Sequence, residues 1–101
     1  MESDLMSVML IVRITSKPGR GKELAQLIQP VPKDNEFDGC FGMEVLQNSS
    51  DQDEIIIIEY WDSIQRHKSF MTDLQAAGEL DKMLELSEAV KRTYYVETTA
   101  S

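Results

Sequence analysis

The residues best suited to chemistry stand close together in "EYWDSIQRH", residues 59–67. His67 is the single histidine of the chain, and it is the side chain whose unperturbed pKa lies near neutrality. Because it sits in an otherwise apolar helical stripe, we predict that it accepts a proton from a bound ligand. Trp61 would then pack against the ligand and offer its indole N–H. The alternative is structural: a buried histidine bonded to a backbone carbonyl, beside a tryptophan that seals the core.

Four further side chains are predicted to contact the ligand: Tyr60, Tyr94, Phe70 and Met71. Tyr94 and Tyr95 are neighbours on a predicted strand, so they point to opposite faces of the sheet. At most one of these two tyrosines can therefore reach the ligand, and the sequence leaves open which one does.

Other polar residues give weaker signals. Arg13, Glu44 and Glu59 lie in the middle of predicted strands, where they could form a polar cluster inside a dimer or a structural ion pair. Cys40 is the single cysteine, which excludes an intrachain disulfide and any multi-cysteine metal site. One histidine with scattered carboxylates does not predict a transition-metal site, so neither a metal nor another cofactor is expected.

The size and charge of the chain limit its function. Its 101 residues fit a single domain, expected to span residues 1–101 with a core at about 7–97. Ten Lys and Arg against 18 Asp and Glu give a net charge of −8, which disfavours nucleic-acid binding and docking on anionic membranes. "MESDLMSVML" lacks the features of a secretory signal, and no apolar run approaches the ~20 residues of a membrane span. A cytoplasmic location is expected.

Hydrophobic patterning predicts four strands, two helical regions and short turns. The first helix carries Leu24, Leu27 and Ile28 on one face and is stopped by Pro30 and Pro32. The connector "KDNEFDG" then leads into a hairpin. The predicted strands are residues 7–15, 40–48, 54–61 and 91–99.

The second helical region follows the third strand. Asp62 is its predicted N-cap, with Gln65 completing a capping box. Gly78 is expected to interrupt the helix, and a short second segment then runs through "GELDKMLELSEAV". The side chains predicted to face inward are Ile64, His67, Met71 and Leu74, with Phe70 beside them, and then Leu80, Met83 and Leu84.

The order strand–helix–strand–strand–helix–strand predicts a ferredoxin-like α+β fold, βαββαβ, with a four-stranded antiparallel sheet and helices on one face. The first and third strands, which are the least polar, would lie in the centre. "IIII", residues 55–58, places apolar side chains on both faces of the sheet. Because the helices can cover one face only, we expect a homodimer with sheets packed face to face, against the alternative of a monomer with an apolar face.

Three segments resemble the antibiotic biosynthesis monooxygenase (ABM) family of dimeric α+β barrels: "VRITSKPGRGKELAQLI", "DGCFGMEVLQ" and "IIIIEYWDSIQRHKSFM". The shared pattern is Gly39-Cys40 opening the second strand, Glu59-x-Trp61 ending the third and His67 in the next helix. The resemblance implies a small-molecule pocket between sheet and helices, with Trp61 lining it and His67 facing it. It also implies cofactor-free oxidation of phenols or quinols, with molecular oxygen as co-substrate.

Two departures from the family pattern bear on activity. Ile57 occupies the position at which phenol-oxidising members carry an asparagine. The first strand has no asparagine and the later helical segment no histidine, so haem degradation is not expected. The function predicted from the sequence is a cofactor-independent monooxygenase acting on an aromatic phenol or quinol. The alternative is a non-catalytic ferredoxin-like dimer that binds a small molecule or serves as a regulatory domain.

Overall fold

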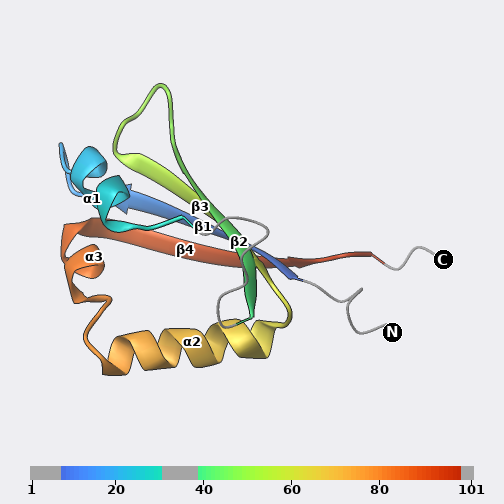
Figure 1. The fold of residues 1–101 in the computed structure, drawn as a ribbon. Coiled ribbons are helices and arrows are strands. Elements are labelled where there is room, and N and C mark those ends of the chain that lie inside the picture. Colours follow the sequence, from blue (N-terminus) through green and yellow to red (C-terminus); the bar gives the residue numbers. More distant parts are fainter. Residues whose placement is uncertain (1–7, 31–38, 99–101) are drawn as a thin grey trace.

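The computed structural model describes residues 8–30 and 39–98, which form a four-stranded antiparallel sheet and three helices (Figure 1). The strand order is β2-β3-β1-β4, so the first and third strands are central, as predicted. The ferredoxin-like α+β fold is thereby confirmed. The elements are β1 (Val8–Ser16), α1 (Gly21–Leu27), β2 (Cys40–Gln47), β3 (Glu54–Trp61), α2 (Ile64–Ala76), α3 (Asp81–Leu86) and β4 (Ser87–Val96).

The inner face of the sheet, which we define as the face toward the helices, is built by alternate residues of the two central strands. Leu10, Ile14 and Ile55 are completely buried there. Register pairs Ile14 with Ile55 and Leu10 with Glu59, so the core is continuous across β1 and β3. Burying each such aliphatic side chain stabilises the fold by roughly 1.5–3 kcal/mol.

Helix α2 runs along the inner face of the sheet (Figure 1). Its buried residue is His67. Its N-cap is Ser63, whose Oγ accepts a hydrogen bond from the Arg66 backbone N–H at 3.0 Å. The predicted cap, Asp62, is wrong by one residue: Ser63 has the extended backbone that the cap requires. Asp62 instead pairs with the Arg66 guanidinium at 3.6 Å. The helix ends before Gly78, which has a positive φ of 75° and interrupts it as predicted.

The segment after Gly78 differs from the prediction in two ways. Strand β4 already begins at Ser87, so the helical segment ends earlier and the strand is longer than expected. Leu84 is 49% exposed, whereas Leu86 is buried. Spacing explains this difference, since Leu86 follows Met83 by three residues and lies on the same face of α3. The predicted connector 33–38, Pro32, Ser7 and Thr99 lie outside the described residues.

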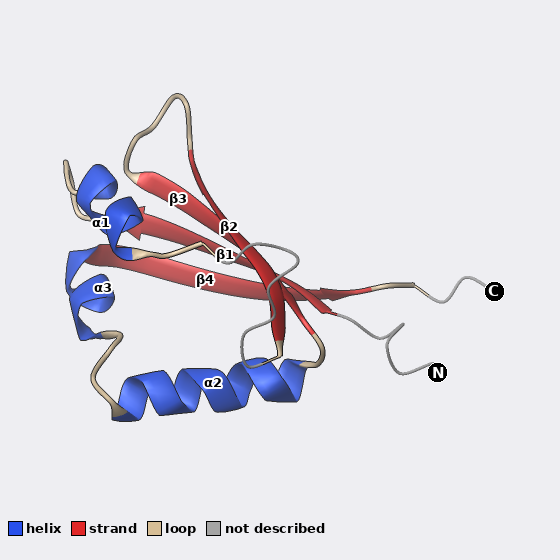
Figure 2. Cartoon of the chain, viewed as in Figure 1, coloured by secondary structure: helices blue, strands red, loops and turns tan. Residues whose placement is uncertain are grey.

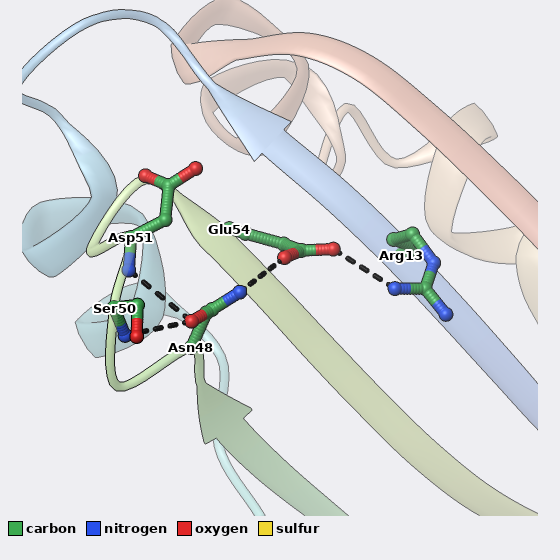
Figure 3. A network of polar contacts seen from close by, with 5 residues as sticks. All are labelled: Arg13, Asn48, Ser50, Asp51 and Glu54. Carbon is green, nitrogen blue, oxygen red and sulfur yellow. Dashed lines mark hydrogen bonds and ion pairs between the residues drawn. The ribbon is translucent and has the colours of Figure 1, made fainter.

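The turn between β2 and β3 is closed by the polar network in Figure 3. Asn48 Oδ1 accepts the backbone N–H groups of Ser50 at 2.7 Å and Asp51 at 3.2 Å. Asn48 Nδ2 donates to one oxygen of Glu54 at 2.6 Å, and Arg13 of β1 donates to the other at 2.9 Å. These two hydrogen bonds lower the pKa of Glu54, and the bond from Asn48 has the larger effect. Arg13 is thus paired with a carboxylate at the hairpin.

The connection from β1 to α1 is fixed by Asp53. Its carboxylate accepts hydrogen bonds from the backbone N–H of Gly19 at 3.0 Å and of Gly21 at 3.1 Å. Gly21 is buried against the backbone of Gln52, where an added Cβ would overlap the Gln52 carbonyl. A glycine is therefore required at position 21 for α1 to start this close to the β2–β3 turn.

The outer face of the sheet carries the other side chains of the central strands. Ile11 pairs with Ile58 and Met9 with Tyr60, and these residues are partly buried. Leu46 of β2 and Tyr95 of β4 are about half exposed. Among the helices of residues 8–30 and 39–98, none is long and apolar enough to cross a membrane.

Candidate functional site

A cavity of about 540 Å³ lies between the inner face of the sheet and the three helices, whose arrangement Figure 2 shows by element type. Its walls are mainly aliphatic, aromatic and thioether side chains, with polar groups at a few places. The lining residues are Val12, Leu27, Ile28, Gln29, Pro30, Cys40, Met43, Ile57, Glu59, Trp61, His67, Phe70, Met71, Leu74, Glu79, Leu80, Lys82, Met83 and Arg92. This volume falls within the range of pockets that hold small organic molecules.

Glu59 and Trp61 form the first polar pair of the cavity wall. They are two residues apart on β3 and so point to the same face of the sheet. The indole Nε1–H of Trp61 donates to Glu59 Oε1 at 2.7 Å, and both residues are buried. Burial raises the pKa of Glu59, while the hydrogen bond from Trp61 and the positive charge of Arg92 oppose this rise. The indole N–H that was predicted to bond to a ligand donates to Glu59 in this structure.

His67 and Tyr94 form the second polar pair. His67 Nδ1 and the Tyr94 hydroxyl are hydrogen-bonded at 2.7 Å, which joins α2 to β4. His67 is 2% exposed, and burial lowers the pKa of its ring from 6.5 to about 4, with the positive charges of Arg92 and Lys68 adding to the shift. Burial raises the pKa of the Tyr94 hydroxyl. Near neutral pH both members of the pair are therefore uncharged.

Aromatic rings form one wall around these two pairs. The Trp61 ring meets His67 edge-on with centroids 5.2 Å apart, and it meets Phe70 at a tilt with centroids 5.3 Å apart. His67 in turn lies edge-on to Tyr94 at 5.5 Å. Such edge contacts are favourable aromatic geometries. They fix the orientation of the Trp61 ring, which is consequently a rigid surface for a flat ligand.

Arg92 is a positively charged residue of the cavity wall. Arg92 projects from β4 at the register position of Val12, two residues before Tyr94. Its positive charge acts on Glu59, His67 and Tyr94 alike. No ion pair joins the Arg92 guanidinium to an acidic side chain within residues 8–30 and 39–98.

The predicted ligand-contacting residues are divided between the two faces of the sheet. Trp61, His67, Phe70 and Met71 all line the cavity. Tyr94 lies behind His67 and bonds to it, and it is not itself part of the lining. It is on the inner face opposite Leu10, whereas Tyr95 is on the outer face and 51% exposed.

Tyr60 lies on the outer face, opposite Met9, and does not line the cavity, so the structure does not bring it together with Trp61 and His67. Strand alternation explains this, because Tyr60 is the immediate neighbour of Trp61. The same rule separates Glu59 from Arg13, which is bonded to Glu54 instead. The suggested cluster of Arg13, Glu44 and Glu59 is therefore wrong as well.

Glu59 and Arg92 are among the cavity residues that the sequence did not predict as ligand contacts. Glu59 could have been recognised from its i, i+2 spacing to Trp61, since this spacing puts both side chains on one face. Arg92 gives no comparable signal, because its face depends on the register of β4 against β1. Within the described ranges, no three His, Cys, Asp or Glu side chains are grouped closely enough to hold a metal ion.

Comparison with protein families gives one match. Residues 7–75 match the family model described as antibiotic biosynthesis monooxygenase, so the match covers more than half of the chain. No curated protein matches the sequence.

Solved structures share the fold over nearly the whole chain. A candidate antibiotic biosynthesis monooxygenase from Chloroflexus aurantiacus J-10-fl has a TM-score of 0.73 and 24% identity, with 94% of this chain and 96% of that one covered. A conserved protein from Methanosarcina mazei Go1 has a TM-score of 0.73 and 13% identity, with 95% and 97% covered. Another candidate monooxygenase of this type, from Deinococcus radiodurans, has a TM-score of 0.64 and 21% identity, with 93% and 95% covered. At these identities the similarity establishes the fold.

Proposed function

This chain belongs to the antibiotic biosynthesis monooxygenase family, and from that premise we propose that it oxidises a phenol or quinol with molecular oxygen and without a bound cofactor. The observation that carries the proposal is the cavity of about 540 Å³, which is largely apolar and has acid–base groups on its wall. An apolar chamber suits a flat aromatic substrate, and the polar groups suit its hydroxyl. Trp61 supplies apolar ring surface at this place in the cavity, and Glu59 and His67 supply the polar groups.

The reaction balances without an external reductant. A hydroquinone and one O₂ give a hydroxyquinone and one water, and the substrate supplies all four electrons. The protein then has three tasks, which are to hold the ring, to accept the hydroxyl proton and to stabilise the anion that reacts with oxygen. Trp61 and Phe70 offer the ring surface, and the positive charge of Arg92 favours the anion.

The test is oxygen uptake by protein dialysed against chelator, across a panel of hydroquinones and polycyclic phenols, with spontaneous oxidation subtracted. We expect turnover by the wild type and a large loss in His67→Ala, which removes a cavity wall. Ser69→Ala, an exposed position on the same helix, is the matched control and should keep wild-type turnover. Trp61 fluorescence under nitrogen reports binding separately, because Trp61 is the one tryptophan. Compounds that bind without any oxygen uptake would contradict the oxygenase and leave a binding domain.

We also propose that two copies pack through the outer faces of their sheets. Ile11, Ile56 and Ile58 place aliphatic side chains side by side on this face, and the helices lining the cavity lie on the other one. Burying ~400 Å² of apolar surface in total would favour association by roughly 10 kcal/mol before association costs.

Sedimentation equilibrium tests the dimer directly. We expect twice the chain mass for the wild type and the monomer mass for Ile58→Lys, because an unpaired charge would be buried in the interface. Gln26→Lys adds the same charge at an exposed position on α1 and should remain dimeric. A wild type that sediments as a monomer at all concentrations would contradict the proposal.

A further inference from the structure

We propose that Glu59 is the residue that takes the hydroxyl proton of an aromatic ligand in the cavity, through its Oε2 atom. This deepens the oxygenase proposed above by naming its proton acceptor and the ligand group that this acceptor selects. The binding part of the inference, a hydroxyl donating to Glu59, holds whether or not oxygen then reacts.

The geometry of Glu59 is that of a prepared acceptor. The side chain is 9% exposed and lines the cavity. Oε1 is held by the Trp61 indole N–H at 2.7 Å, which fixes the plane of the carboxylate. Among the described residues no hydrogen bond reaches Oε2, so this oxygen is left open to the cavity. A carboxylate oxygen without a protein donor can accept a hydrogen bond from a ligand hydroxyl.

His67, the proton acceptor predicted from the sequence, is less suited to this role. Its Nδ1 is already bonded to the Tyr94 hydroxyl at 2.7 Å. With a pKa of about 4 the ring holds an added proton only weakly, because burial disfavours the imidazolium. A base works best when its pKa lies near the working pH. We therefore assign His67 the role of a neutral wall and hydrogen-bonding group, oriented by Tyr94.

Several charged or titratable groups line the same cavity as Glu59 or interact with its charge. They are Cys40 from β2, His67 from α2, Lys82 from α3, Arg92 and Tyr94 from β4, and Glu79 between α2 and α3. Burial, with a smaller contribution from the Glu59 charge, raises the pKa values of the Cys40 thiol and the Tyr94 hydroxyl, so both are protonated at neutral pH. Of the two positive residues in this group, Arg92 is the one whose charge acts on Glu59.

The proton step follows from this arrangement. The ligand O–H bond breaks, its electron pair stays on the ligand oxygen, and the proton binds Glu59 Oε2. The positive charge of Arg92 then faces a phenolate beside a neutral acid, so the net charge of the pair does not change. A ligand carboxylate in the same place would meet Glu59 with like charge. The site should therefore prefer phenols to aromatic acids.

The first experiment uses 4-nitrophenol under nitrogen, since its phenolate is coloured and no oxidation can intervene. Wild type, Glu59→Gln and the exposed-residue control Glu88→Gln are saturated with the probe and titrated with base. Because Glu59 and the probe share a proton in the wild type, full colour should appear at a pH about one unit or more above that of Glu59→Gln. Glu88→Gln should match the wild type. Equal titrations in wild type and Glu59→Gln, or no binding by the wild type, would overturn the proposal.

A second experiment needs no substitution. Phenol and benzene are titrated into the wild type under nitrogen from pH 4.5 to 8, and binding is followed by Trp61 fluorescence. Phenol affinity should rise several-fold as Glu59 ionises, since a hydroxyl bonds more strongly to a carboxylate than to a carboxylic acid. Benzene affinity should stay constant, and a parallel rise for both ligands would refute the role of Glu59. If phenol behaves as expected but the oxygen-uptake panel is negative, the Glu59 site stands and the oxygenase does not.

Discussion

Acidification from pH 7 to pH 4 should destabilise this fold through its single histidine. His67 is buried at the contact of α2 with the sheet, and its pKa falls from 6.5 in the unfolded chain to about 4 in the folded one. Between these two values the unfolded chain binds a proton that the folded chain does not. The contribution of His67 to stability is therefore complete above pH 6.5 and is lost as the pH falls toward 4.

The magnitude follows from the size of the pKa shift. A difference of 6.5 against about 4 corresponds to about 3 kcal/mol at 25 °C, since each pKa unit is worth about 1.4 kcal/mol. A small domain is stable by only about 5–15 kcal/mol, so this change is a large share of the total. Glu59 acts in the opposite direction, because its raised pKa favours the folded state at low pH. The contribution of Glu59 cancels when the wild type is compared with His67→Gln, because both proteins contain Glu59.

The assay is urea unfolding of wild type and His67→Gln at pH 7 and pH 4, at one protein concentration. The glutamine side chain of this variant cannot titrate but can still bond to the Tyr94 hydroxyl. We expect the wild type to lose about 3 kcal/mol more than His67→Gln between the two pH values. The imidazole signal in the NMR spectrum of the folded wild type, which belongs to one residue only, should titrate near pH 4. A midpoint near 6.5, with equal pH dependence in both proteins, would refute a buried neutral His67.

Three further substitutions test the site and the fold. Glu59→Gln should leave stability unchanged at pH 4 and raise it at pH 8, because the cost of a buried carboxylate is present only above its pKa. Melting temperatures at both pH values check this, with Glu88→Gln as the exposed control. Trp61→Phe should cost about 2–3 kcal/mol in urea unfolding, since it leaves Glu59 Oε1 without its donor and a void beside it; a loss below about 1 kcal/mol would contradict the hydrogen bond. Gly21→Ala should lower the melting temperature by several degrees, since its Cβ overlaps the Gln52 carbonyl, whereas Lys22→Ala next to it should have little effect.

Much of the fold could be read from local patterns. The β-branched runs predict the strands, and the element order predicts that the first and third are central, in agreement with the low polarity of "VMLIV" and "IIII". Gly78 ends α2 as predicted because a left-handed backbone favours glycine. The N-cap was missed by one residue, since Asp62 and Ser63 are both good caps and their backbone geometry decides between them.

The site could be read only in part. The spacing of His67, Phe70 and Met71 predicts one helix face, and all three side chains line the cavity. Tyr60 lies on the other face of the sheet, because strand alternation puts it opposite to its neighbour Trp61.

What the sequence determined by itself is therefore the order of the elements and the residues that share a face within one element, because both follow from the fixed periods of strand and helix. Tertiary structure alone decided which faces meet. The bond from Tyr94 to His67 depends on the register of β4 against β1 and on where α2 docks, and no local period specifies either one. The raised pKa of Glu59 has the same origin, since a carboxyl group is desolvated only once helices cover the sheet.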